Sequence, residues 1–141
     1  MRSERLAAGL AELGIDTTQQ RQEALLGYLE QLEKWNRHYN LTAIRDPALM
    51  VTRHLFDSLA VRPFLSGTRY IVVGTGAGLP GIPLAIVDPQ HHFTLLDSIG
   101  KKTRFLRHVV AHLGLSNVEF LPACVEIFEP VARFDAVLSR A

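Results

Sequence analysis

The sequence has very little cysteine: Cys124 is the single one among its 141 residues. An internal disulfide is therefore impossible, which fits a reducing compartment. The chain also lacks a long hydrophobic run, since no apolar stretch approaches the roughly 20 residues that a membrane-spanning helix needs. No signal peptide opens the chain. Together these absences predict a cytoplasmic protein with no membrane partner.

A strong excess of charge is also missing, because 15 Lys and Arg residues nearly balance 14 Asp and Glu residues and leave a net charge of +1. This is not the balance of a protein that coats nucleic acid, so any such contact must use a local basic patch. His108 and His112 lie four residues apart, but no acidic residue or cysteine accompanies them at metal-ligand spacing. We therefore expect no metal site.

The length suits one domain with a real hydrophobic core, and the first part of the chain is predicted to be helical. Leucines repeat at helical spacing up to Gly14, and Thr17 or Thr18 can cap a second helix that runs to about Tyr39. A third helix is expected after the turn at Asp46-Pro47; it carries Met50, Val51, His54, Leu55, Ser58 and Leu59 and ends before Pro63. We assign 1–66 to an N-terminal helical extension and 67–141 to the first half of an α/β domain, together one compact unit.

Short apolar segments and helical segments alternate in the second part of the chain. Strands are expected at 70–73, 93–97, 117–121 and 134–139, and helices at 82–87 and 101–113. This order predicts βαβ units and an α/β fold with a parallel sheet. The chain stops at Ala141, where the fourth strand would be left as a bare edge. We therefore expect an incomplete sheet and a protein truncated at its C-terminus.

Three glycines, Gly74, Gly76 and Gly78, follow the first predicted strand directly. Here the chain must turn sharply into a helix while its backbone approaches a ligand, and a side chain would block that approach. Asp97 ends the next strand, about 20 residues further on, where a carboxylate can accept hydrogen bonds from ribose hydroxyls. The pattern predicts a nucleotide-type cofactor and fits NAD and S-adenosylmethionine equally. A tight turn with a capping aspartate is the alternative that needs no ligand.

Longer blocks carry a resemblance that covers essentially the whole chain. The most specific are KWNRHYNLTA at 34–43 and GTGAGLPGIPLA at 74–85, with shorter matches at 45–47, 53–54, 57–58, 95–98, 100–102, 104–107 and 139–141. In this order they closely resemble the bacterial small-subunit rRNA guanine-N7 methyltransferases, the RsmG or GidB family (glucose-inhibited division protein B).

The resemblance implies a Rossmann-like class I methyltransferase that uses S-adenosylmethionine to methylate N7 of a guanine in the decoding-region loop of 16S rRNA. Its partner would be 16S rRNA or the small ribosomal subunit, and we expect a monomer. By motif, Val125 and Glu126 match the position that holds the adenine, and Arg140 lies at the cofactor and substrate end of the sheet. The predicted cofactor-binding residues are therefore Gly74, Gly76, Gly78, Leu79, Asp97, Val125, Glu126 and Arg140.

One position in the turn departs from the family. An acidic residue usually precedes the Val-Gly of the turn, and this chain has Val72 there. A valine cannot accept the hydrogen bonds that such an acid would make. A non-catalytic fragment of the fold is therefore one alternative function. The other is a nicotinamide-dependent oxidoreductase built on the same scheme of strand, glycine turn and aspartate.

No catalytic residue is assigned, because guanine N7 carries a lone pair and can attack a methyl group without first losing a proton. Alignment and desolvation would supply the catalysis. Basic clusters in 101–113 and in the helical extension are expected to hold RNA phosphates. The predicted RNA-binding residues are Arg53, His54, Lys101, Lys102, Arg104 and Arg107. Trp35 and Tyr39 are expected to pack the extension against the α/β domain, with stacking on a base as the alternative.

Overall fold

The computed structural model describes residues 2–96, 100–121 and 134–139. Its first helix, α1 (Arg2–Glu12), buries Leu6 and Leu10 and is followed by Gly14 at φ 71°. The second, α2 (Gln19–Tyr39), is capped by Thr18, whose hydroxyl accepts a hydrogen bond from the backbone N–H of Arg21 at 3.1 Å. Both helices and the second of the two proposed caps are therefore confirmed.

The third predicted helix is confirmed, but it is not a uniform α-helix. It consists of α3 (Pro47–Met50), a π-helical stretch η1 (Val51–Phe56) and α4 (Asp57–Leu59). Its buried residues are Met50, Val51, His54, Leu55, Ser58 and Leu59, all of which the predicted helix carries. A short 3-10 turn, η2 (Arg62–Phe64), follows.

Within the described residues, four parallel strands form the sheet, in the order β3-β2-β1-β4. They are β1 (Arg69–Val73), β2 (His92–Leu96), β3 (Val118–Leu121) and β4 (Ala136–Leu138). All four predicted strands and the parallel α/β class are confirmed. In the described residues β4 borders only β1, and Val137 at this edge is 68% exposed.

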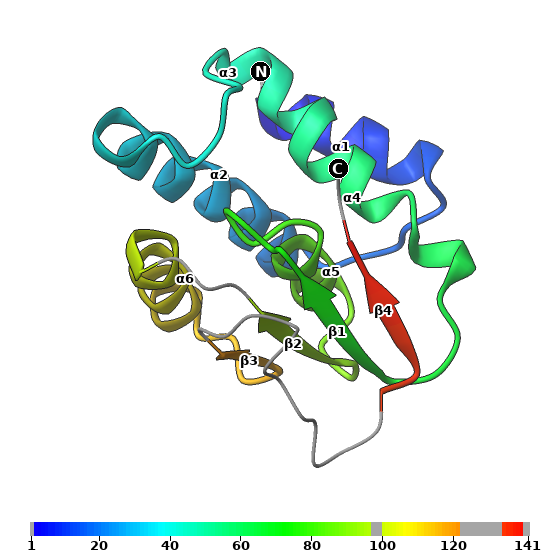
Figure 1. Cartoon of the computed structure of the whole chain (residues 1–141). Helices are drawn as coiled ribbons and strands as arrows, with labels where there is room; N and C mark the ends of the chain where they lie inside the picture. The colour runs from blue at the N-terminus through cyan, green and yellow to red at the C-terminus, as the bar shows by residue number, and fades with distance from the viewer. Residues whose placement is uncertain (1, 97–99, 122–133, 140–141) are drawn as a thin grey trace.

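Helix α5 (Gly81–Val87) is buried along its whole length, between β2 and the helices α2 and α4. A helix that is apolar on all sides needs such surroundings. It lies close to the sheet because Gly81 has no side chain: a Cβ there would lie 2.4 Å from Leu95 Cδ2. Helix α6 (Gly100–Leu113) packs against α2 and β3. The N-terminal helices and the sheet thus share one hydrophobic core (Figure 1).

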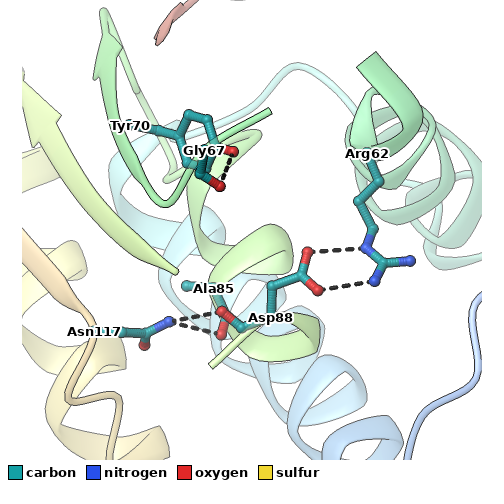
Figure 2. Close-up of polar contacts among 6 residues, drawn as sticks. All are labelled: Arg62, Gly67, Tyr70, Ala85, Asp88 and Asn117. Atoms are coloured by element: carbon teal, nitrogen blue, oxygen red, sulfur yellow. Dashed lines mark hydrogen bonds and ion pairs between the residues drawn. The ribbon is translucent and has the colours of Figure 1, made fainter. Parts of the chain in front are cut away.

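Polar contacts close the end of the sheet at which the strands begin (Figure 2). Arg62 donates two hydrogen bonds to the carboxylate of Asp88, at 2.9 and 2.8 Å, and the Asp88 side chain is 4% exposed. The side-chain amide of Asn117 donates to the carbonyls of Ala85, Asp88 and His91 at 2.9–3.3 Å. These contacts tie η2, the end of α5 and the start of β3 together, far from the edge at which the strands end.

Candidate functional site

The glycine turn leaves β1 at the carboxyl edge of the sheet. Gly74, Gly76 and Gly78 have φ values of 66°, 56° and 99°, which residues with a side chain rarely adopt. The backbone N–H of Gly74 donates to the carbonyl of Leu96 at 2.9 Å, which fixes the turn to the end of β2. A sharp turn of glycines after the first strand is therefore present as predicted.

The three glycines are required for different physical reasons. A Cβ on Gly74 or Gly76 would meet no described atom within 4 Å, so the space beside the backbone is open at both positions. A Cβ on Gly78 would lie 2.5 Å from Ile82 Cγ1 and 3.0 Å from Leu106 Cδ2. Gly78 thus permits the packing of the turn against α5 and α6, whereas the other two leave room for a ligand.

A hydrogen bond from the helical extension supports the glycine turn. The hydroxyl of Tyr28, on α2, donates to the carbonyl of Ala77 at 2.7 Å, and Tyr28 is fully buried. Its ring also contacts that of Phe105 on α6, with centroids 6.4 Å apart. Sequence reasoning missed this contact. The available signal was a tyrosine on the apolar face of α2, where a buried hydroxyl requires a partner.

A second contact network orders the segment 41–44, which follows α2. The side-chain oxygen of Asn36 accepts a hydrogen bond from the backbone N–H of Thr42 at 3.0 Å, and Asn36 is 2% exposed. The Thr42 hydroxyl oxygen accepts from the backbone N–H of Ile44 at 3.2 Å and lies 3.0 Å from Nε2 of His54. The segment is thus fixed to both α2 and η1, a connection that sequence spacing did not reveal.

Segment 41–44 and the glycine turn border an open pocket of about 260 Å³, here called the turn pocket. It is lined by Leu41, Thr42, Ala43, Ile44, His54, Gly74, Thr75, Ala77 and Leu79. Thr75 is 3% exposed, and its hydroxyl oxygen is buried without a hydrogen-bond partner among the described residues. Because an unsatisfied buried hydroxyl costs free energy, this oxygen is a natural contact for a ligand.

The structure brings four of the predicted cofactor-binding residues together: Gly74, Gly76, Gly78 and Leu79 all belong to the turn, and Leu79 is 7% exposed. The other four, Asp97, Val125, Glu126 and Arg140, lie outside the described residues. Val72, which replaces the usual acid, is fully buried, and its Cγ2 would lie 3.3 Å from a Cβ on Gly81. Its side chain therefore faces α5.

The predicted RNA-binding residues do not form one surface. Arg53 is exposed on η1, whereas His54 beside it is 3% exposed and lines the turn pocket. His54 therefore does not share an exposed surface with Arg53, because the packing of its helix turns the ring inward. On α6, Arg104 and Arg107 are exposed and Lys102 is half-buried, and the side chain of Lys101 lies outside the described part.

Aromatic contacts join α2 to α6 next to these arginines. The ring of Trp35 lies with its centroid 5.7 Å from that of Phe105 and 5.2 Å from that of His108. Tyr39 contacts Trp35 with ring centroids 5.4 Å apart. The expected packing of the extension through Trp35 is therefore confirmed. The guanidinium of Arg107 lies 5.0 Å from the ring centroid of Phe120 on β3.

No three His, Cys, Asp or Glu side chains of the described residues lie close enough together to hold a metal ion. None of the helices within these residues is long and apolar enough to cross a membrane.

A parallel sheet of this strand order, with a glycine turn after its central first strand, defines the Rossmann-like class of α/β proteins. Comparisons with known proteins make the assignment more specific. Residues 21–141 match the family model GidB, described as rRNA small subunit methyltransferase G. The chain belongs to this family.

Individual relatives agree with the family match. The ribosomal RNA small subunit methyltransferase G of Shewanella amazonensis is 51% identical over 141 residues, which is 100% of this chain and 68% of the relative. The protein of the same name from Shewanella denitrificans is 52% identical with the same coverage. That of Yersinia pseudotuberculosis is 55% identical over 132 residues, 94% of this chain and 64% of the relative. The chain thus spans about two thirds of the length of these proteins.

The family match bears on the reaction class that the glycine turn and Asp97 left open. The family is one of methyltransferases, so the nicotinamide-dependent oxidoreductase has no support.

Proposed function

We propose that this chain uses S-adenosylmethionine to methylate N7 of a guanine in the decoding-region loop of 16S rRNA. The observation that carries the proposal is the pocket beside the glycine turn, in a chain whose relatives are named small-subunit rRNA methyltransferases. S-adenosylmethionine supplies an electrophilic methyl group when it is bound. We further propose that the protein acts as a cytoplasmic monomer.

The described residues fit such a cofactor. Gly74 and Gly76 leave open space beside the backbone, and Leu79 adds an apolar surface. Asp97 would hold the ribose, and Val125 and Glu126 would hold the adenine. Arg140 would contribute at the end of the sheet where cofactor and substrate meet. These last four assignments rest on the sequence motif.

The chemistry asks little of ionisable side chains. N7 of guanine holds its lone pair in the ring plane, so no proton has to be removed before methyl transfer. The protein then contributes by orienting the base and excluding water. The turn pocket lies beside the glycine turn, and its described lining offers apolar surface from Leu41, Ile44 and Leu79 for this task.

We propose that RNA phosphates bind the exposed arginines of η1 and α6. Arg53 lies on η1, and Arg104 and Arg107 lie on α6. Charge contacts of this kind add affinity without sequence choice and weaken as salt rises. Lys101 and Lys102 at the start of α6 complete the proposed set.

Two measurements test the function. Calorimetry with S-adenosylhomocysteine is expected to show binding, and NAD is expected to show none. Incubation with labelled S-adenosylmethionine is expected to label 16S rRNA or the small ribosomal subunit, but not a decoding-region RNA in which 7-deazaguanine replaces guanine. The non-catalytic alternative would be favoured if the chain neither binds S-adenosylhomocysteine at millimolar concentration nor transfers a methyl group. A gain of affinity in Val72→Asp would then identify the missing acid as the cause.

A further inference from the structure

We propose that a second pocket, at the opposite end of the sheet from the glycine turn, binds a small organic carboxylate through Arg62. The pocket has a volume of about 350 Å³ and lies between the end of α1, the turn η2 and the loop that precedes β2. It is here called the amino-end pocket, and its described lining includes Leu13, Gly14, Arg62, Leu65, Gln90 and His91. No residue of the proposed cofactor and RNA sites is among them. The site is therefore additional to the proposed function.

The guanidinium of Arg62 is oriented before any ligand binds. Its Nε and Nη2 donate to the carboxylate of Asp88 at 2.9 and 2.8 Å, and the Asp88 side chain is 4% exposed. A guanidinium carries five N–H groups, so those of Nη1 and the second one of Nη2 remain for another acceptor. Figure 2 shows this third nitrogen directed away from Asp88. Nη1 and Nη2 together form a planar fork that matches the two oxygens of a second carboxylate.

Exposure and charge favour a ligand with a single negative charge. The side chain of Arg62 is 32% exposed, so its free fork is accessible while Asp88 is shielded from solvent. Arg62 and Asp88 are the Lys, Arg, Asp or Glu residues of the described lining, and their charges balance. A phosphate dianion would bring two negative charges to one arginine that already has a partner, and charge without a partner is costly to desolvate. A carboxylate brings one charge and uses the fork completely.

The remaining lining suits an apolar body attached to that carboxylate. Leu13, Pro63 and Leu65 supply apolar surface, and the exposed side-chain amide of Gln90 adds an N–H donor. A Cβ on Gly14 would meet no described atom within 4 Å, so the wall is open beside this residue. The volume of about 350 Å³ falls within the roughly 300–1,000 Å³ usual for sites that hold small molecules. The pocket therefore has room for a short hydrocarbon chain or a single ring.

The test is an NMR titration of the ¹⁵N-labelled 141-residue chain with hexanoate. Acetate keeps the carboxylate without the apolar body, and hexanamide keeps the body without the charge. We expect hexanoate to shift the backbone amides of Gly14, Leu65, Gln90 and His91. Hexanamide is expected to bind about tenfold more weakly, since it cannot form the charge-assisted fork. Acetate is expected to bind about tenfold more weakly, an effect that about two buried methylene groups produce.

Three outcomes overturn the proposal. Hexanoate shifts none of these four amides, or acetate and hexanoate bind equally, which would show an adventitious ion contact only. Inorganic phosphate, titrated at the same ionic strength, binds more tightly than hexanoate, which would assign the pocket to a phosphate ligand. Saturating S-adenosylhomocysteine is expected to change the hexanoate affinity less than about twofold, and competition between the two would place the carboxylate in the cofactor site. The titration with hexanoate needs no methyl transfer, so its result does not depend on the proposed function.

A variant of Arg62 tests the fork itself. Arg62→Lys keeps a positive charge opposite Asp88 and removes the planar fork, so we expect hexanoate to bind about tenfold more weakly and hexanamide to be unaffected. Arg5→Lys is the matched control, because it makes the same change on α1 at a guanidinium that donates to the carbonyl of Ala48. Its hexanoate affinity is expected to stay within about twofold of the wild type, and an equal loss in both variants would refute the role of Arg62.

A second variant keeps the question open to decision if Arg62→Lys does not fold. Gln90→Ala changes an exposed side chain and is expected to weaken hexanoate about threefold, the effect of one hydrogen bond of modest strength. Unchanged hexanoate affinity in Gln90→Ala, together with equal binding of hexanoate and acetate by the wild type, would remove the site.

Discussion

Replacement of Tyr28 by phenylalanine removes one oxygen atom from the support of the glycine turn. The hydroxyl donates to the carbonyl of Ala77 at 2.7 Å in a fully buried position. The phenylalanine ring would keep the contact with Phe105, so the change removes the hydroxyl and preserves this ring packing.

The expected cost follows from the acceptor that remains. The carbonyl of Ala77 would stay buried without this donor, which destabilises a protein by about 1–3 kcal/mol. For a chain of this length the midpoint of thermal unfolding falls by roughly 2–4 °C for each kcal/mol. Because the bond ends on the turn itself, we also expect a weaker affinity for S-adenosylhomocysteine, by about tenfold at most.

Urea unfolding followed by circular dichroism measures the stability, and calorimetry measures the affinity. Tyr39→Phe is the matched control, since it makes the same chemical change on the same helix at a residue that is 36% exposed. The reasoning is refuted if Tyr28→Phe loses no more stability than Tyr39→Phe, or if it loses stability while the affinity of the turn for its ligand is unchanged.

Three further predictions concern Gly76 in the turn, Asn117 before β3 and Asp135 before β4. Gly76→Ala is expected to lower stability by about 1–2 kcal/mol through its left-handed backbone, since a Cβ there has free space; unchanged urea unfolding would contradict this. Asn117→Ala is expected to lower the free energy of unfolding by about 1–3 kcal/mol, because three backbone carbonyls share its amide donors. A loss of stability no larger than that of an alanine substitution at an exposed position would argue against this role. Hydrogen bonds from the backbone N–H groups of Arg69 and Thr68 lower the pKa of Asp135 in the folded protein. The carboxylate therefore stabilises the fold fully above its pKa in the unfolded chain, about 3.9, and this stabilisation is lost as pH falls through the folded pKa. Unfolding of Asp135→Asn is therefore expected to depend less on pH below about pH 4 than that of the wild type, and equal pH dependence would exclude this account.

Most of the fold could be predicted because its signals are local. The apolar run at 70–73, the glycines after it and the leucine spacing of the first helices each reflect only the neighbouring chain. The π-helical stretch at Val51–Phe56 was not predicted, because buried residues spaced four apart also suit an ordinary α-helix.

The candidate site was predicted in part, for a different reason. The glycine turn could be found because backbone conformation restricts residue type at each position. Tyr28 and Thr42 were missed because their partners lie far away in sequence: Ala77 for the first, and Asn36 and His54 for the second. The burial of His54 was missed for a related reason. A histidine near arginines in the sequence suggests a basic surface, and only the packing of its helix shows that the ring is buried.

The sequence by itself determined the class of this protein, the order of its strands and helices, and the turn that follows the first strand. These depend on side-chain periodicity and on the backbone freedom of glycine, which act over a few residues. Only the tertiary structure decided that the helical extension supports the turn through Tyr28 and forms one wall of the turn pocket through Thr42. Those contacts join residues that meet when α2 packs over α5, and no local pattern fixes which polar atoms then face one another.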